Sequence, residues 1–276
     1  MSLTVRTNIT SLMAAGALGR TNSSLGNTVG RISSGLRITQ AADDAAGLGV
    51  ATNLGSVARS TAQAMRNAND GISIIQTAEG ASDEVVDILQ RMRELAVQSS
   101  SETLANDERS FISDEFSQLR SEIARIASVT EFNGLALADG SDSQVEVQVG
   151  VENDSSSRIA IQLGDLRTGT TGLNLASVDL GGVTSAQSAI DTIDTALDTV
   201  NGFRSDLGSV QNRLDSALAS AGVYQENLTG ATSTIQDADY AVETSEMTKY
   251  QIMQQAGVAA LAQAKNINQA VVSLLS

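Results

Sequence analysis

The sequence predicts a mainly α-helical protein, a long antiparallel coiled coil or helix bundle with a small β-hairpin region. Three observations support this fold class. The 276 residues include no proline, so nothing removes a backbone donor inside a long helix. Aromatic residues make up only 3%, too few for a large globular core, whereas small and aliphatic side chains can fill a thin bundle. Apolar residues recur at alternating spacings of three and four in several long segments.

The N-terminal end is predicted to form a helix that packs against the C-terminal end. Residues 1–42 contain four arginines and no acid, although the whole chain carries a net charge of -15. An apolar stripe at helical spacing is formed by Leu25, Val29, Ile32 and Leu36. A segment with this pattern is expected to be buried against a partner helix.

A first long helix is predicted to begin just after Asp43 and Asp44, because acids favour a helix N-terminus. It runs towards Ser99, and a break follows around residues 99–101. Its clearest stripe comprises Val85, Leu89, Met92 and Ala96. A second helix is predicted to start near Asn106, with a stripe at spacings of four and three that comprises Ile112, Phe116, Leu119, Ile123 and Ile126.

A β-hairpin near residues 144–164 interrupts the helical pattern. Val145, Val147 and Val149 alternate with polar residues, and a second alternating run covers residues 159–163. A period of two predicts half-buried strands, and the polar residues 150–157 between them predict the turn. The Gly-, Thr- and Ser-rich residues 168–185 are the best candidate for an exposed loop.

A third helix returns along the bundle, and a fourth closes the chain. The third carries a seam of more than four heptads, interrupted by two polar residues: Ile190, Ile193, Leu197, Val200, Arg204, Leu207, Gln211, Leu214, Leu218 and Ala221. The last helix carries a seam with small residues that let a partner backbone approach: Tyr250, Met253, Gly257, Ala260, Ala264, Ile267, Val271 and Leu274. Two discontinuous domains result: 1–43 with 236–276 as a terminal coiled coil, and 44–235 as a helical bundle with the hairpin.

Composition excludes several classes of function. The chain has no His and no Cys, so the usual zinc sites and the Ser-His and Cys-His nucleophile pairs are absent from the sequence. We therefore expect no enzyme, metal or cofactor. Nucleic-acid binding is disfavoured, because eleven acids and only two bases lie between Glu131 and Val200. No apolar run approaches the ~20 residues of a membrane helix, and no signal-peptide pattern is present at the start.

Several runs of residues resemble bacterial flagellin, the subunit of the flagellar filament, in the same order at both ends of the chain. The runs are Arg31–Arg37 (RISSGLR), Ala42–Leu48, Arg66–Ile72, Leu89–Gln98 and Phe132–Gly134, then Gln211–Asp215, Asp237–Tyr240, Gln254–Gly257, Leu261–Ala264 and Ser273–Leu275. The resemblance covers roughly residues 1–135 and 185–276. Only about fifty residues separate Phe132–Gly134 from the returning helix, which implies a short form without outer variable domains.

The resemblance implies a structural subunit that self-assembles into the extracellular flagellar filament used for swimming. It also implies secretion through the flagellar export machinery without a cleaved peptide, an export chaperone, and contacts with the filament cap and hook-junction proteins. From the residues themselves, we expect residues 1–42 and roughly 236–276 to lack a partner in the free subunit, and therefore to be largely disordered until they become helical on assembly. Two alternatives stay open: a hook–filament junction protein, and a secreted helical effector or adaptor.

One motif within the run Leu89–Gln98 resembles the helix that the animal Toll-like receptor for flagellin binds. The positions that match the receptor-contact pattern are Arg91, Leu95 and Gln98, and Glu115 on the next helix matches its acidic neighbour. An arginine beside an exposed leucine is a plausible interface anchor. In this family the same surface packs between subunits, and this subunit contact is expected to be its primary role.

Overall fold

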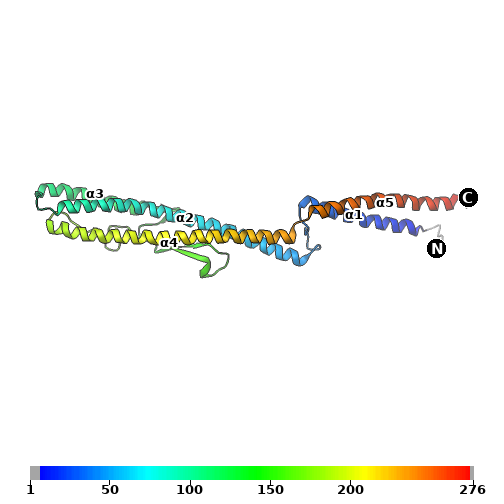
Figure 1. Cartoon of the computed structure of the whole chain (residues 1–276), viewed down its shortest axis with the longest axis horizontal. Helices are drawn as coiled ribbons and strands as arrows, with labels where there is room; N and C mark the ends of the chain where they lie inside the picture. Colours follow the sequence, from blue (N-terminus) through cyan, green and yellow to red (C-terminus); the bar gives the residue numbers. More distant parts are fainter. Residues whose placement is uncertain (1–6, 274–276) are drawn as a thin grey trace. The chain divides into compact units, whose positions relative to one another are not determined.

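The computed structural model describes residues 7–273, with the side chains of residues 7–266. Within this range the chain is mainly α-helical, as predicted (Figure 1). The five α-helices are α1 (Ile9–Ser34), α2 (Ala45–Ser99), α3 (Asn106–Val129), α4 (Val183–Gln236) and α5 (Tyr240–Ser273). The short strands are β1 (Glu131–Phe132), β2 (Leu135–Ala136), β3 (Gln144–Gln148) and β4 (Arg158–Gln162).

The chain divides into two compact units. The terminal unit comprises the residues up to Ser56 together with those from Asn227 onward, and the central unit spans Val57–Glu226. These boundaries fall inside α2 and α4. The two domains predicted from the sequence have other boundaries, between residues 43 and 44 and between residues 235 and 236. That division stays a prediction.

The predicted starts of both helices are confirmed, and an acidic side chain caps each of them. The side chain of Asp44 accepts a hydrogen bond of 2.8 Å from the Gly47 backbone N–H, and α2 begins at Ala45. At the start of α3, the Glu108 carboxylate reaches back to the Ala105 backbone N–H at 3.1 Å. Each carboxylate thus satisfies a backbone donor at a helix N-terminus.

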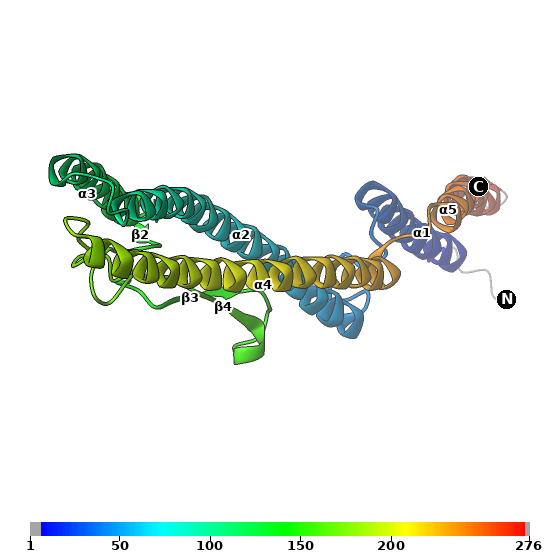
Figure 2. The same cartoon turned by 60° about the vertical axis from the view of Figure 1, so that its left-hand side comes forward.

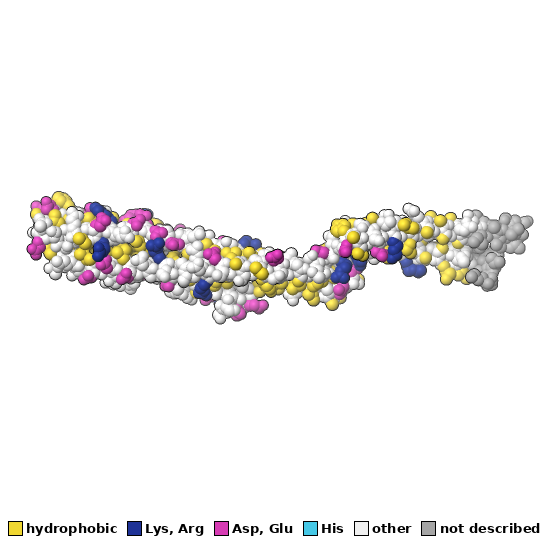
Figure 3. Space-filling model, viewed as in Figure 1, with side chains coloured by type: hydrophobic (Ala, Val, Ile, Leu, Met, Phe, Trp, Pro, Cys, Tyr) yellow, Lys and Arg dark blue, Asp and Glu magenta, His cyan; other side chains and the backbone are white. Residues whose placement is uncertain are grey.

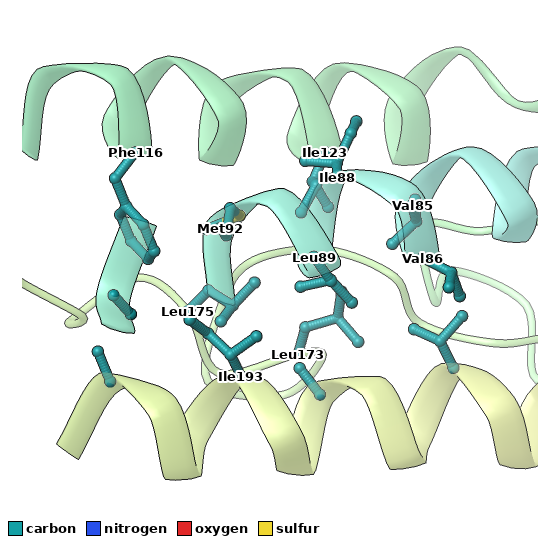
Figure 4. Packing of buried hydrophobic residues seen from close by; sticks show 14 of the residues in the cluster. Val85, Val86, Ile88, Leu89, Met92, Phe116, Ile123, Leu173, Leu175 and Ile193 are labelled. Atoms are coloured by element: carbon teal, nitrogen blue, oxygen red, sulfur yellow. The ribbon is translucent and has the colours of Figure 1, made fainter. Parts of the chain in front are cut away.

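The core of the central unit lies between α2, α3 and α4. Leu89 and Met92 of α2 are fully buried, and Figure 4 shows them between Phe116 on α3 and Ile193 on α4. The predicted stripe of α2 is entirely buried, as is that of α3 apart from the partly buried Leu119. Burial of large aliphatic and aromatic side chains contributes ~1.5–3 kcal/mol for each, so this cluster is the main source of stability in the unit.

The structure of residues 168–182 differs from the prediction. They were expected to form an exposed loop, but Leu173, Leu175 and Leu180 are 3%, 0% and 0% exposed. Figure 4 shows Leu173 and Leu175 pointing into the same core as Leu89. Irregularly spaced leucines among Gly and Thr give no periodic signal, yet each one fills the space between helices. The segment is therefore a packed strap, and α4 begins at Val183, slightly earlier than expected.

The β-hairpin is confirmed at the predicted place. Strands β3 and β4 pair antiparallel, with Val147 opposite Ile159. Both side chains are buried in a second apolar cluster with Leu214 of α4. Gly71 makes this approach possible, because a β-carbon at that position would meet Val147 at 3.0 Å. Figure 2 shows the hairpin beside α4, with its turn projecting from the bundle.

Candidate functional site

The terminal unit is organised by an antiparallel pair of helices, α1 and α5. Near one end of the pair, the Asn8 side-chain amide donates to the Ala264 carbonyl at 2.9 Å. In the middle, the Gln254 amide donates to the Asn22 side chain at 2.9 Å. At the other end, the Tyr240 hydroxyl donates to the Ile32 carbonyl at 2.8 Å. The two ends of the sequence therefore lie side by side, each as the other's partner.

The face of α1 towards α5 follows a regular alternation of three and four. The shielded residues at this spacing are Ser11, Ala14, Leu18, Thr21, Leu25, Thr28 and Ile32. Two predicted seam residues, Leu25 and Ile32, belong to this face, and Leu36 is half-buried beyond the helix. Val29 does not belong: it is 45% exposed, whereas its neighbour Thr28 is 5% exposed. The prediction for Val29 as a residue facing α5 was wrong, because a polar residue occupies the buried position.

The same correction applies to α5. Its shielded residues at heptad spacing are Glu243, Met247, Tyr250, Gln254, Gly257, Leu261 and Ala264. Tyr250, Gly257 and Ala264 were predicted to lie in the seam, and they do lie on the face towards α1. Met253 and Ala260 are exposed, so their assignment to that face was wrong. The side chains of Ile267, Val271 and Leu274 lie outside the described residues.

A partly buried ionic cluster joins three segments of the terminal unit, and sequence reasoning missed it. Arg31 of α1 lies 3.4 Å from Glu243 of α5 and 3.7 Å from Asp43. Glu243 is only 8% exposed. Hydrogen bonds from the Thr39 backbone lower the pKa of Asp43 below its ordinary value of 3.8, against a smaller opposing effect of desolvation. Arg31 and Asp43 lie in runs that resemble flagellin, but no pattern in the sequence pairs either of them with Glu243, which is about two hundred residues away along the chain.

The outer faces of the terminal helices expose large apolar side chains. On α1, Ile9, Leu12 and Met13 are 56%, 69% and 70% exposed. The exposed large apolar residues of α5 include Tyr240, Val242, Ile252, Met253 and Val258. On the face seen in Figure 3, hydrophobic side chains occur along both units, and most of the acidic side chains lie over the central unit. On α1 the three residues have the spacing i, i+3 and i+4, and contiguous apolar exposure of this kind is typical of an interaction surface.

The two units differ in net charge. The central unit contains 26 acids and 11 bases, whereas the terminal unit contains 6 of each. The whole net charge of -15 therefore belongs to the central unit. A neutral unit with exposed apolar faces can approach another copy without long-range repulsion.

The second predicted surface lies on α2 and α3 of the central unit. Arg91 donates to Glu115 at 2.8 Å and to Glu94 at 2.9 Å, and the hydrogen bond with Glu115 is the main cause that raises the pKa of Arg91. Gln98 is exposed on the same helix. Leu95 is 1% exposed and belongs to the apolar core, so the prediction of an exposed leucine beside Arg91 was wrong.

Neither a metal site of acidic side chains nor a membrane-spanning helix occurs among the described residues. No group of three or more Asp and Glu side chains is arranged to hold a metal ion among residues 7–266. None of the helices, over the part of the chain that the structure describes, is both long and apolar enough to cross a membrane.

Comparison with known proteins gives consistent matches along the chain. The family model for the bacterial flagellin N-terminal helical region matches residues 5–143, and that for the C-terminal helical region matches residues 190–275. A flagellin of Halalkalibacterium halodurans is 47% identical over 245 residues, with 89% of each chain covered. A flagellin of Xenorhabdus nematophila is 39% identical over 314 residues, with both chains covered in full.

Two solved structures are also similar. The crystal structure of Bacillus cereus flagellin has a TM-score of 0.50 and 31% identity, and the match covers 56% of this chain and 88% of that one. The structure of a putative flagellar hook-associated protein from Vibrio parahaemolyticus has a TM-score of 0.59 and 15% identity, with 71% and 100% of the two chains covered. At 15% identity, this second likeness concerns the fold alone.

Proposed function

The chain belongs to the bacterial flagellin family, and we propose that its paired terminal helices join one copy to the next in the flagellar filament. As a flagellin, it is a structural subunit that self-assembles into the extracellular filament. The observation that supports our assignment of the contact is the exposed apolar face of α1 and α5, which has Leu12, Met13 and Ile252 at 69%, 70% and 62% exposure.

The physical reason for a contact at these helices is that the described residues of the terminal unit form no large apolar cluster of their own. Among residues 7–266, both large apolar clusters consist of residues of the central unit. The α1–α5 seam contains Thr21, Thr28 and Gln254, whose polar side chains contribute less on burial than leucine. Contact with neighbouring copies would cover the outer apolar faces and supply the missing burial. Each newly added copy would gain the same stabilisation, so the polymer extends by repetition of one contact.

A catalytic role is not part of this proposal. The sequence has no His or Cys, and the residues that stand out in the terminal unit are apolar or form ion pairs within the chain. The alternatives considered from the sequence, a junction protein and a secreted effector, are not favoured, because flagellin relatives match this chain over nearly its whole length.

Further partners follow from family membership as proposals. The subunit would leave the cell through the flagellar export machinery with the help of an export chaperone, and it would meet the filament cap and hook-junction proteins. Its apolar terminal faces would need protection from premature association before export, which supports a chaperone for this region.

A host Toll-like receptor is a further proposed partner, at the surface of Arg91, Gln98 and Glu115. Arg91 and Glu115 are about half exposed and already oriented by their hydrogen bond, so little entropy would be lost on binding. Leu95 would act from the core, where it supports the backbone beneath Arg91. The surface would be available on the free subunit and covered within the filament.

Seeded polymerisation of the purified subunit tests the proposed role of the terminal faces. Wild-type protein should extend filament seeds into long filaments visible by electron microscopy. Ile252→Lys places a charge on the outer face of α5 and should stop growth while the α1–α5 pair stays intact. The matched control is Gln251→Lys, at a neighbouring exposed polar position of the same helix. Equal growth of Ile252→Lys and wild type would refute the assignment of this face to the contact between copies.

A further inference from the structure

Phe111 is an exposed aromatic side chain with a ring of acids around it. It lies on α3 and is 73% exposed, more than any other large hydrophobic residue in the described part of the chain. Residues three and four positions away on a helix are its surface neighbours. All four of these positions hold acids: Asp107, Glu108, Asp114 and Glu115. The result is an apolar knob within a negatively charged rim.

Of the four acids around Phe111, three form no ion pair with any described residue, and Asp107 and Asp114 are the two whose carboxylates also accept no hydrogen bond from the described part of the chain. Glu115 is paired with Arg91 at 2.8 Å, and Glu108 accepts from the Ala105 backbone at 3.1 Å. Asp107 and Asp114 form no ion pair with any described residue of the chain. The knob thus presents an aromatic ring together with carboxylates that can still meet a positive partner.

A hollow of matching character lies elsewhere on the same unit. It has a volume of about 480 Å³ and lies between α2, α4 and the turn of the β3–β4 hairpin. Its apolar lining includes Val149, Val151, Ala217 and Tyr224, and the last of these is 47% exposed. Figure 2 shows the hairpin turn that forms one wall, projecting beside α4. An aromatic side chain is one that can cover a large part of such an apolar lining.

Positive charge lies next to this hollow. A second hollow of about 490 Å³ shares Val149, Ser156 and Ala217 with the first and is also lined by Arg158 and Arg213. Arg158 is paired with Glu146 at 3.1 Å. Arg213 makes no ion pair within residues 7–266, although its unit carries a large excess of acids. The first hollow is itself lined by the acid Glu152 and by no base. The positive charge that can face the acidic knob around Phe111 is therefore that of Arg213, in the adjoining hollow.

The knob and the hollow cannot meet within one copy. Thr61 of α2 lines the hollow, and Arg91, thirty residues later on the same uninterrupted helix, contacts Glu115 beside the knob. At 1.5 Å per residue, thirty residues of α-helix span about 45 Å. Figure 1 shows the same relationship, with the α2–α3 connection at one end of the bundle and the hairpin turn well along it.

We propose that Phe111 of one copy inserts into the hollow between the hairpin and α4 of the next copy, with Asp107 and Asp114 facing Arg213. The proposal rests on the proposed function, because it names a second contact within the same homopolymer. Two different patches on one chain that complement each other form a heterologous contact, which repeats without closing. The contact belongs to the central unit and adds to the one between terminal helices.

Disulfide trapping tests this contact sharply, because the natural chain has no cysteine. The double variant Phe111→Cys with Tyr224→Cys is assembled on seeds and then oxidised mildly. Filaments should give a ladder of covalent multimers on a denaturing gel, whereas dilute oxidised monomer should not. The control pair is Phe111→Cys with Val129→Cys, since Val129 is also exposed on α3 but lies away from the hollow. Filaments of the test pair without a ladder, or an equal ladder from the control, would overturn the proposal.

A charge swap tests the same contact without removing the phenylalanine. Asp114→Arg and Arg213→Asp should each raise the critical concentration for filament growth at least about threefold, and the double swap should restore it. Failure of the double swap to restore growth would overturn the contact, even if the cysteine variants did not assemble. Failure of wild-type protein to form filaments at all would instead overturn the proposed function, so the two claims fail separately.

Discussion

Gly257 of α5 lies directly against Leu18 of α1: a β-carbon added at Gly257 would come within 3.2 Å of the Leu18 Cδ1 atom. The Leu18 side chain therefore packs against the α5 backbone at a position where α5 has no side chain. Such close approach is the reason that small residues recur at helix–helix contacts. It also makes this position a sensitive test of the pair.

Gly257→Leu should separate α1 from α5. A leucine there must displace Leu18 or the α1 backbone, and overpacking of this kind costs ~1–3 kcal/mol. Hydrogen exchange of the monomer should show weaker protection of both helices, and electron microscopy should show no filaments. Unchanged protection would contradict the close approach.

Ala260→Leu is the matched control on the same helix. Ala260 is exposed, so the substitution should leave hydrogen-exchange protection of the α1–α5 pair unchanged. If the outer face of α5 contacts a neighbouring copy, as we propose, this variant should be exported without growing filaments. Filaments of normal length would show that this part of the face stays uncovered.

The terminal unit should open at a much lower free energy than the central unit. The large apolar clusters built on Leu89 and Leu214 belong to the central unit, and the terminal unit depends on one thin, partly polar seam. Regions with few buried apolar contacts open locally before the rest of the chain unfolds. Limited proteolysis of monomer should remove both ends and leave a stable fragment near residues 45–235. Equal resistance of the ends in monomer and filament would contradict this.

Much of the fold was predictable because its signals are local. The starts of α2 and α3 follow from acids that cap them, and the hairpin follows from the alternation around Val147. The strap that carries Leu175 was not predictable, because its leucines follow no period and are buried only by contact with distant helices.

The details of the interaction surfaces were less predictable. The seam of α1 was assigned to Val29 because apolar residues dominate the pattern, yet Thr28 is the buried neighbour. In α5, Gln254 displaces Met253 from the seam because its amide bonds to Asn22 across the pair. Leu95 differs from these residues, because its spacing from Ile88 and Met92 is consistent with a buried position. It was predicted to be exposed because of the resemblance to the receptor-binding motif.

Arg109→Ala should destabilise the central unit. Arg109 is 4% exposed and donates to the backbone carbonyls of Ser99, Ser101 and Leu104, which holds the connection between α2 and α3. Its loss leaves carbonyls without a donor, at a cost of ~1–3 kcal/mol for buried groups. Urea unfolding should show a lower midpoint with an unchanged slope. Arg109→Lys should recover part of the loss, and a midpoint equal to wild type for Arg109→Ala would contradict the role.

Asp43 should make the turn before α2 sensitive to acid. Because hydrogen bonds from Thr39 lower the pKa of Asp43 in the folded state, its stabilisation is present above the ordinary value of 3.8 and is lost as the pH falls through the lowered folded value. Hydrogen exchange of residues 39–44 should accelerate over that range. Asp43→Asn should exchange faster at neutral pH and show a flatter pH dependence, and an unchanged acid response in this variant would contradict the assignment.

Arg91→Ala should separate receptor recognition from stability. Arg91 and Glu115 are 51% and 47% exposed, and exposed ion pairs contribute only ~0–1 kcal/mol to folding. Leu95→Ala is the contrasting variant: it leaves a cavity in the core and should cost ~2–5 kcal/mol. Thermal unfolding should therefore show a small change for Arg91→Ala and a large one for Leu95→Ala.

Once the fraction of folded protein is accounted for, Arg91→Ala should weaken the receptor response more than Leu95→Ala does. Free monomer should activate cells that express the flagellin-sensing receptor, and Arg91→Ala should weaken the response at least about tenfold, because a buried interface arginine contributes ~2 kcal/mol or more. Intact filaments should be nearly silent until they are depolymerised, since neighbouring copies would cover the surface. Arg91→Ala should also impair motility if one surface serves both contacts. Full motility with a lost response would show that the two contacts are separable, and silence of the wild-type monomer would mean that Arg91, Gln98 and Glu115 serve assembly alone.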